Sequence, residues 1–206
     1  MADARTQHAR EDADARCAQI VSAARALYEE RGLSSVSVGD ITAAVGVTRS
    51  LFYHYFPNQG AVTSAVLDAY VSEYVEKLAA WNARRRPGDI EHALTTVVGL
   101  LRQEMFEDNP FHEAIVSTEN ASLYLQLIQR VADHTATYLI DTTVQDYASL
   151  HPVAIDHLYE TFYLLIVGLI GLLRAHPDLD DGVVADLIAQ TLHMDRNSER
   201  EDNHAV

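Results

Sequence analysis

Apolar residues recur every three or four positions along most of the chain, whereas apolar and polar residues rarely alternate over five or more positions. Because the first period matches the 3.6-residue turn of an α-helix, the pattern predicts an all-α protein. The first predicted helix has one apolar stripe, formed by Cys17, Ile20, Val21, Ala24, Leu27 and Tyr28. Gly32 follows at a position where a glycine commonly ends a helix, so we predict a helix over residues 13–31.

Two short helices are expected next, with a glycine between them. Ser37 and Asp40 have the spacing of a capping box, which predicts the start of a helix that Gly46 ends. Thr48 is well placed to cap the following helix, which ends before Pro57. Two short helices joined by a short turn that contains glycine form a helix-turn-helix, so residues 13–58 are predicted to be a three-helix domain.

Longer helices are predicted for the rest of the chain. Their ranges are 59–83, 89–107, 110–118, 121–148, 152–175 and 181–194, which brings the predicted helices to nine. Residues 59–194 are therefore expected to form a second domain of about six helices. The two ends lack apolar periodicity, so we expect a flexible N-terminal arm over residues 1–12 and a flexible C-terminal tail over residues 195–206.

The helix-turn-helix carries side chains that suit DNA. Its second helix normally lies in the major groove, with its first residues toward the base edges. The residues in this position are Thr48, Arg49, Ser50 and Leu51, followed by Tyr53 and His54. A hydroxyl at a helix start suits a phosphate, an arginine suits a phosphate or guanine, and a leucine suits a thymine methyl group. The aromatic residues Phe52, Tyr55 and Phe56 are expected in the core by helical spacing.

Residues 32–62, GLSSVSVGDITAAVGVTRSLFYHYFPNQGAV, resemble the signature of TetR-family transcriptional repressors. The resemblance is specific over residues 20–62 and architectural beyond them. It implies that the first three helices bind DNA, that the remaining six form a ligand-binding and dimerisation domain, and that a small molecule releases the operator. The predicted DNA-binding residues are Ser37, Thr48, Arg49, Ser50, Leu51, Tyr53, His54 and Gln59.

Three positions depart from the family pattern. Gln59 stands where the family usually has a lysine that contacts phosphate, Gly39 stands where a basic or polar residue is common, and Thr42 replaces a usual alanine. These departures predict weak nonspecific affinity for DNA, with more specificity carried by the helix that begins at Thr48 and by Arg5, Arg10 and Arg16. They are equally consistent with a loss of DNA binding.

A homodimer is expected because a palindromic operator matches two DNA-binding domains related by a two-fold axis. The last two predicted helices carry apolar stripes with glycines that permit close packing, so they are expected to form a four-helix bundle with a second copy. The predicted interface residues are Leu158, Leu165, Gly168, Leu169, Leu172, Val184, Leu187 and Ile188. The same stripes can also belong to the core of one chain.

Aromatic side chains in the second domain suggest a pocket for a small, mostly apolar ligand. The candidate lining residues are Tyr70, Tyr74, Trp81, Phe106, Phe111, Tyr124, Tyr138, Phe162 and Tyr163. Arg102 and Glu119 are candidates for selecting a charged group on the ligand. Core packing is the alternative explanation for most of the aromatic residues.

The charge distribution qualifies the DNA-binding hypothesis. The chain has 206 residues and a net charge of −15, which by itself argues against nucleic acid. Residues 1–60 hold six arginines and seven acidic residues, a net charge of −1, which leaves −14 for residues 61–206. The pattern is that of a near-neutral DNA-binding domain on an acidic ligand-binding domain.

Several classes of function lack support in the sequence. The single cysteine excludes an internal disulfide and fits a cytoplasmic protein, the N-terminus lacks a signal-peptide pattern, and the apolar run over residues 161–173 is short for a membrane span. The ten histidines show no metal-binding spacing, and no catalytic or nucleotide-binding fingerprint occurs, so no metal, cofactor or enzyme activity is predicted. Two hypotheses remain besides an unsupported enzyme: a ligand-responsive repressor, and a small-molecule or lipid-binding protein with weak or lost DNA binding.

Overall fold

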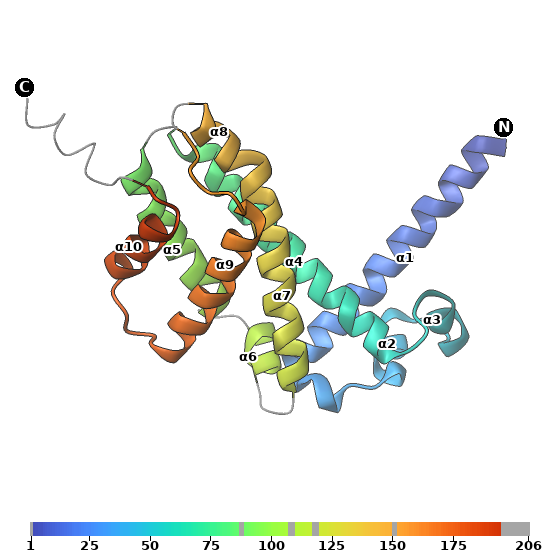
Figure 1. Ribbon diagram of the computed structural model, residues 1–206. Coiled ribbons are helices and arrows are strands. Elements are labelled where there is room, and N and C mark those ends of the chain that lie inside the picture. The colour runs from blue at the N-terminus through green and yellow to red at the C-terminus, as the bar shows by residue number, and fades with distance from the viewer. Residues whose placement is uncertain (1, 87–88, 107–109, 117–119, 150–151, 195–206) are drawn as a thin grey trace, which may run out of the picture. The chain divides into compact units, whose positions relative to one another are not determined.

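The computed structural model describes residues 2–86, 89–106, 110–116, 120–149 and 152–194, and its regular elements there are all helical (Figure 1). This confirms the predicted fold class. The helices are α1 (Ala2–Arg31), α2 (Val38–Val45), α3 (Arg49–Tyr55), α4 (Gln59–Arg84), α5 (Ile90–Phe106), α6 (Pro110–Val116), α7 (Ala121–Leu139), α8 (Gln145–Ala148), α9 (Leu158–Ala175) and α10 (Asp181–Thr191). A 3₁₀ turn (Leu33–Ser35) precedes α2, and a π-helical turn (Ile140–Val144) follows α7.

The chain divides into two compact units. The first, called the head unit here, comprises Met1–Tyr70 and Pro110–Tyr124. The second, called the body unit, comprises Val71–Asn109 and Leu125–Val206. Helices α4 and α7 contribute residues to both units. The predicted boundary at residue 58 therefore falls inside the head unit, which also takes in the start of α4 and all of α6.

The core of the head unit forms where the apolar stripe of α1 meets α2, α3 and α4. Its fully buried side chains include Ile20, Ala24 and Tyr28 of α1, Ile41 of α2, Phe52 of α3, and Val62 and Val66 of α4. The hydroxyl of Tyr28 shares a 3.0 Å hydrogen bond with that of Thr63, which satisfies both groups inside the core. The apolar stripe predicted for the first helix is thus largely confirmed.

Helix α1 begins at Ala2, well before the predicted start at residue 13. Apolar periodicity detects a buried face, whereas residues 2–12 are mostly alanine and charged or polar residues. These residue types favour a helix by intrinsic propensity, and no glycine or proline interrupts residues 2–31. The flexibility expected of residues 1–12 stays a prediction, and residues 195–206 lie outside the described part of the chain.

The helix predicted over residues 121–148 has a wider turn near its end. Helix α7 stops at Leu139, and the π-helical turn Ile140–Val144 joins it to the short α8. The sequence of this turn, IDTTV, contains four β-branched residues. Their branched side chains crowd the preceding turn of an α-helix, which favours a local departure from regular geometry.

The helix predicted over residues 152–175 starts late, at Leu158. The predicted range began at Pro152, but the β-branched Val153 and Ile155 follow it closely and disfavour helix. By length and composition α9 is apolar enough to cross a membrane, a property that core helices of globular proteins share. Its buried residues are Phe162, Ile166, Leu169, Ile170 and Leu173, so one face of α9 packs into the core of the body unit.

Candidate nucleic-acid interface and ligand cavity

Local hydrogen bonds define both helices of the helix-turn-helix. The hydroxyl of Ser37 accepts from the backbone N–H of Asp40 at 3.3 Å, and the Asp40 carboxylate accepts from the Ser37 N–H at 2.8 Å. Gly46 ends α2 in the left-handed conformation, with φ of 72°. The Thr48 hydroxyl then accepts from the N–H of Leu51 at 3.2 Å, capping α3. The capping box, the glycine and the threonine cap are all confirmed.

The predicted DNA-binding side chains lie on the surface of the head unit. Phe52 is fully buried and Phe56 is 8% exposed, so these two rings anchor α3 in the core as predicted. Tyr55, also expected in the core, is half-buried, whereas Ser37, Thr48, Arg49, Ser50, Leu51, Tyr53 and His54 are exposed. Buried rings on one side of α3 therefore leave its polar side and its N-terminus accessible.

Gly39 lies against the guanidinium group of Arg49. A β-carbon added at Gly39 would lie 2.8 Å from Nη2 of Arg49, closer than atoms in contact approach. The glycine thus gives the arginine room to lie beside the start of α2. Since the guanidinium is the end of a flexible chain, a larger residue at position 39 would displace Arg49 and leave the backbone in place.

Gln59 is engaged within the head unit. Its side-chain Nε2 donates to the backbone carbonyl of Val36 at 2.5 Å, and the side chain is half-buried. The bond ties the start of α4 to the segment that precedes α2. Sequence reasoning treated this position only as a phosphate contact, because the pairing spans 23 residues and leaves no local signal.

Asp40 remains ionised at neutral pH. The hydrogen bond from the Ser37 side chain lowers the pKa of its carboxyl, and the Ser37 backbone N–H and the charge of Arg31 act in the same direction. The Arg31 guanidinium lies 4.0 Å from the carboxylate. Asp40 thus serves as a helix cap beside the candidate interface.

A mostly apolar cavity of about 150 Å³ lies in the body unit. It is lined by α4, α5, the end of α7, the π-helical turn, α8, the segment 152–155, α9 and the end of α10. Of the predicted pocket residues, Trp81 and Phe162 line it. The segment 152–155 lines it through Pro152, Val153, Ala154 and Ile155; sequence reasoning missed these residues because it assigned them to a helix.

The other predicted pocket residues lie outside the lining of this cavity. Tyr70 and Phe111 pack against each other in the head unit, with ring centroids 5.7 Å apart, and Arg25 lies 6.0 Å from the centre of the Tyr70 ring. Tyr163 borders a separate open cleft between α7 and α9, beside Tyr159. Tyr74 is buried, and Phe106, Tyr124 and Tyr138 are half-buried. Most of these aromatic residues therefore serve core packing, the alternative that the sequence left open.

Polar side chains from α4, α7, the π-helical turn and α8 form a network beside the cavity. Arg85 donates to Asn82 Oδ1 at 2.6 Å and to Asp146 Oδ2 at 2.7 Å. Asn82 also accepts from the Thr143 hydroxyl at 3.0 Å and donates to the Tyr138 hydroxyl at 3.3 Å. Nearby, the indole N–H of Trp81 donates to the Thr96 hydroxyl at 2.9 Å. The chain itself thus satisfies the polar groups around this part of the cavity.

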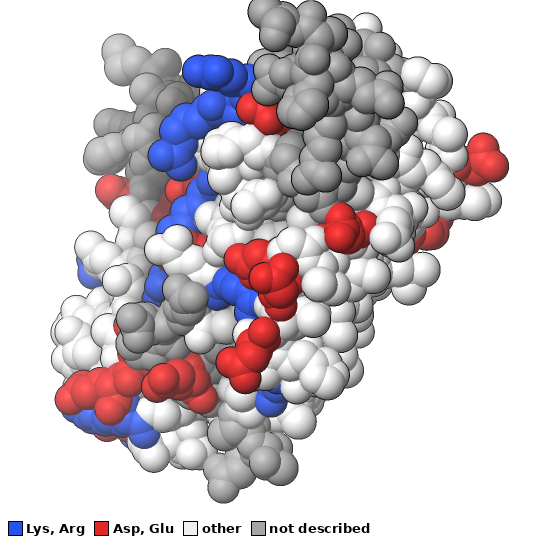
Figure 2. All heavy atoms as spheres, turned by 90° about the vertical axis from the view of Figure 1, so that its left-hand side faces the viewer, with Lys and Arg blue, Asp and Glu red and all other residues white. Residues whose placement is uncertain are grey.

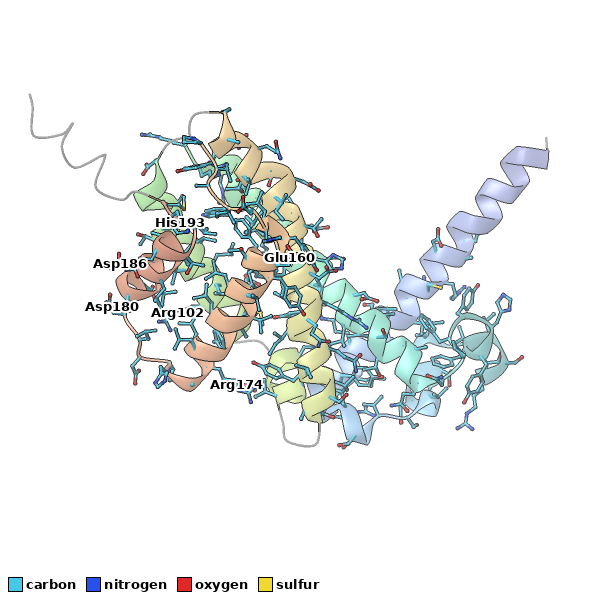
Figure 3. All side chains as sticks on the ribbon, viewed as in Figure 1. Arg102, Glu160, Arg174, Asp180, Asp186 and His193 are labelled. Atoms are coloured by element: carbon cyan, nitrogen blue, oxygen red, sulfur yellow. The ribbon has the colours of Figure 1, made fainter. Side chains whose placement is uncertain are left out.

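Arg102 is bound away from the cavity lining. Its guanidinium donates to the Asp181 carboxylate at 2.5 Å, to the carbonyl of Pro177 at 2.7 Å and to the carbonyl of Leu179. In Figure 3 this side chain lies between α5 and α10, near Asp180 at the start of α10. Arg102 therefore holds the connection between α9 and α10 and is not available to select a ligand. Glu119, its suggested companion, lies outside the described residues.

Comparisons with known proteins agree with the geometry of the head unit. Residues 20–66 match the family model described as bacterial regulatory proteins, tetR family. Over this range the chain is similar to the TetR family. The matched range covers the end of α1, the helix-turn-helix and the first turns of α4, so the predicted resemblance is confirmed where its motifs lie.

Two curated TetR-like relatives extend the match. The transcriptional regulator EthR of Mycobacterium tuberculosis is 29% identical over 140 residues, which cover 64% of this chain and 63% of EthR. The TetC protein of transposon Tn10, from Escherichia coli, is 30% identical over 83 residues, covering 37% of this chain and 42% of TetC. The chain thus matches less than two thirds of the length of these relatives.

Two solved structures share the fold over most of the chain. AlkX, a TetR family repressor from Dietzia sp., has a TM-score of 0.62 at 21% identity, covering 85% of this chain and 94% of AlkX. RolR in complex with resorcinol has a TM-score of 0.55 at 19% identity, covering 93% of each chain. At this identity the likeness concerns the fold alone, which is all-α with an N-terminal helix-turn-helix domain.

The TetR-like body unit presents an exposed apolar face on α9 and α10. The exposed aliphatic side chains on these two helices include Leu164 at 70%, Val183 at 45% and Leu187 at 37%. Of the predicted dimer-interface residues, Leu187 and Gly168 are exposed, Leu158, Leu165 and Leu172 are half-buried, and Leu169, Val184 and Ile188 are buried. Figure 3 labels Glu160 and Arg174 on α9 and Asp186 on α10, charged residues of the same two helices.

The buried members of the predicted interface pack inside their own chain. Leu158 and Ile188 line the cavity, and Val184 is fully buried. Sequence spacing identified the apolar stripes but not which edge of each stripe faces outward. Within the described residues, no group of three or more histidine, cysteine, aspartate or glutamate side chains is placed to hold a metal ion.

Proposed function

We propose that this protein is a TetR-family transcriptional repressor that binds a palindromic operator as a homodimer and is released by a small, mostly apolar ligand. The observation that carries the proposal is the start of α3. Exposed Thr48, Arg49 and Ser50 stand at a capped helix N-terminus, held by the buried Phe52. This is the arrangement by which a recognition helix contacts phosphates and base edges in the major groove.

The dimer is supported by the exposed apolar face of α9 and α10. Leu164, Val183 and Leu187 expose apolar surface to water, and Gly168 on the same helix as Leu164 permits close approach of a second copy. A two-fold dimer presents two recognition helices to successive major grooves, about 34–36 Å apart. Self-association through this face would match the symmetry of a palindromic operator.

The ligand response is supported by the cavity in the body unit. A cavity lined by aromatic and aliphatic side chains with a few polar groups suits a small organic molecule. To release the operator, the ligand must bind the DNA-free conformation more tightly than the DNA-bound one. Helix α4 contributes residues to both units, so a change in α4 on ligand binding would couple the cavity to the head unit. Such a regulator acts in the cytoplasm and needs no enzyme activity.

Selection of bound duplexes from a randomised DNA pool tests the proposal. The purified full chain is incubated with the pool at low and at physiological salt. Recovery of one palindromic sequence is expected, with the two half-sites one helical turn apart. Recovery of no preferred sequence at either salt would contradict the repressor function. Sedimentation of the protein with the selected duplex then measures how many copies bind.

A second function is favoured by the internal hydrogen bond of Gln59. An uncharged residue that is already bonded to Val36 contributes less to phosphate binding than a free lysine would. The protein would then bind small molecules or lipids, with weak or lost DNA binding. If selection fails with the natural chain but succeeds with Gln59→Lys, charge loss at this position explains the lost activity.

A further inference from the structure

We infer that the cavity of the body unit takes an uncharged or cationic apolar molecule and rejects apolar carboxylates. The inference rests on the proposed ligand response and specifies the chemical class of the ligand. It depends on one juxtaposition: the Arg85 guanidinium and the N-terminus of α5 each already hold a carboxylate of the chain itself, that of Asp146 and that of Asp89.

Arg85 is the one lysine or arginine among the described residues that line the cavity. Its side chain is only 10% exposed, and it donates to Asp146 at 2.7 Å and to Asn82 at 2.6 Å. Its neighbours Arg84 and Arg86 are exposed and do not line the cavity. An incoming carboxylate would have to compete with Asp146 for the guanidinium, and a charge left without a partner in a partly buried site is costly.

The α5 N-terminus also already holds a carboxylate of the chain. Asp89 precedes the helix, and its carboxylate accepts from the backbone N–H of His92 at 3.2 Å. A helix N-terminus attracts anions through its free N–H groups and its dipole, and here a carboxylate of the chain fills that role. The lining thus has two carboxylates and one guanidinium, and it also contains His193; with His193 neutral, the excess of carboxylates opposes a further negative charge.

The rest of the lining suits an apolar molecule. Trp81, Phe162 and Leu94 contribute apolar surface, and the polar side chains of the network are bonded to one another. An aliphatic or aromatic body can therefore be buried without leaving buried polar groups unpaired. A neutral hydroxyl at its end needs no countercharge, and an ammonium is attracted by the two carboxylates and by aromatic faces.

Trp81 provides a local readout, since it is the only tryptophan of the chain and lines the cavity. The full-length protein is titrated at pH 7 with octanol, octylamine and octanoate, and with the matching set built on a 3-phenylpropyl group. We expect octanol and octylamine to change Trp81 emission at concentrations about tenfold or more below those needed for octanoate, the effect of one uncompensated charge in a partly buried site.

Two variants test the cause of the selectivity. Asp146→Asn frees the Arg85 guanidinium and should raise the affinity for octanoate relative to that for octanol about tenfold. Asp89→Asn retains a capping side chain and should raise octanoate affinity about threefold, since the dipole is weaker than a full charge. The matched control is Asp141→Asn, an exposed carboxylate in the π-helical turn that does not line the cavity; it should leave all three affinities unchanged.

The outcomes separate this inference from the proposed function. Carboxylates that bind as tightly as the matched alcohols overturn the inference and leave the ligand response intact. An equal gain for Asp141→Asn and Asp146→Asn also overturns it, because general electrostatics would then explain the effect. No change in Trp81 emission with any of the six probes contradicts the cavity as a ligand site and overturns both.

Discussion

The head and body units use their positive charges differently. In the body unit, Lys77 pairs with Glu104 at 2.6 Å, Arg85 with Asp146 at 2.7 Å and Arg102 with Asp181 at 2.5 Å. Figure 2 shows acidic and basic side chains interspersed on one face of the molecule. In the head unit, Arg49 is exposed and makes no ion pair with a described residue. Arg25 and Arg31 of the head unit also pair with acidic side chains, so Arg49 is the arginine of the helix-turn-helix that remains accessible to a partner.

This difference answers the objection raised by a net charge of −15. Phosphate binding depends on cations that are free to release counterions, and a paired cation contributes little. An acidic body unit in which Lys77, Arg85 and Arg102 are internally paired can accompany a head unit with an accessible arginine. The following predictions test or sharpen the comparison, from the largest expected effect to the smallest.

Phe52→Ala should impair the head unit and leave ligand binding by the body unit intact. Phe52 is fully buried in the head unit, so its truncation should cost about 3–5 kcal/mol of stability and abolish operator binding. The response of Trp81 to octanol should persist, because the cavity belongs to the body unit. Thermal unfolding, DNA-binding titration and Trp81 emission measure the three effects. Loss of the Trp81 response with the fold intact elsewhere would show that the units depend on each other.

Arg49→Ala should weaken binding to the selected operator by about 1–3 kcal/mol and weaken nonspecific binding less. The reason is that Arg49 is exposed at the start of α3, where base edges are read. Binding titrations with the operator and with a scrambled duplex measure the difference. Arg31→Ala is the matched control, since Arg31 is already paired with Glu30 and lies near Asp40. Equal losses of affinity for the two duplexes would show that Arg49 contacts only phosphate.

Ser37→Ala should destabilise the head unit by about 0.5–2 kcal/mol through loss of the α2 cap. The pKa of Asp40 should rise toward its ordinary value, because the Ser37 side chain is the largest cause of its lowering. A carboxyl group whose pKa is lowered by folding stabilises the fold when the pH is above the ordinary carboxyl pKa. This stabilisation is lost as the pH falls through the lowered pKa. The variant should therefore show a weaker loss of stability in acid, measured by urea unfolding against pH and by NMR titration.

Asp180→Ala is the corresponding cap variant in the body unit. The Asp180 carboxylate accepts from the N–H of Gly182 at 2.9 Å and caps α10. A comparable loss of stability is expected there, with no change in operator affinity beyond that caused by unfolding. If both cap variants reduce operator binding equally in the folded protein, the cap of α2 has no special role in the interface.

Gln59→Lys should add a cation to the head unit. Operator affinity should rise at low salt, and the dependence of log affinity on log salt should become steeper by about one. Loss of the bond to Val36 should cost about 1 kcal/mol of stability, unless the lysine donates to the same carbonyl. Gln59→Ala is the control that removes the bond without adding charge. An unchanged salt dependence would show that position 59 does not reach phosphate.

Tyr159 should ionise later than an ordinary tyrosine. Its hydroxyl donates to Asp133 at 2.6 Å, and this hydrogen bond is the main reason that its pKa rises to about 12. The stabilisation is complete below the ordinary tyrosine pKa of about 10 and is lost as the pH rises toward 12. Asp133→Asn should lower the pKa. Ultraviolet absorbance titration, compared between the two proteins, checks this without any effect expected on DNA binding.

Interactions between residues close in the sequence could be predicted, whereas interactions between distant residues could not. The Ser37 cap and the Thr48 cap each act over three residues, so their spacing was visible in the sequence. The bond from Gln59 to Val36 spans 23 residues, and that from Arg102 to Asp181 spans 79. No periodic pattern marks pairs at such distances, which is why neither partner was foreseen.

The sequence by itself determined the all-α class, the caps of α2 and α3, the burial of Phe52 and the family of the head unit, because these depend on helical period and on interactions between near neighbours. Only the tertiary structure decided which edge of each apolar stripe on α9 and α10 is exposed and which aromatic residues border the cavity. It also decided that the cavity's own carboxylates occupy Arg85 and the start of α5. These properties depend on how distant segments pack, and a stripe of apolar residues is compatible with several such packings.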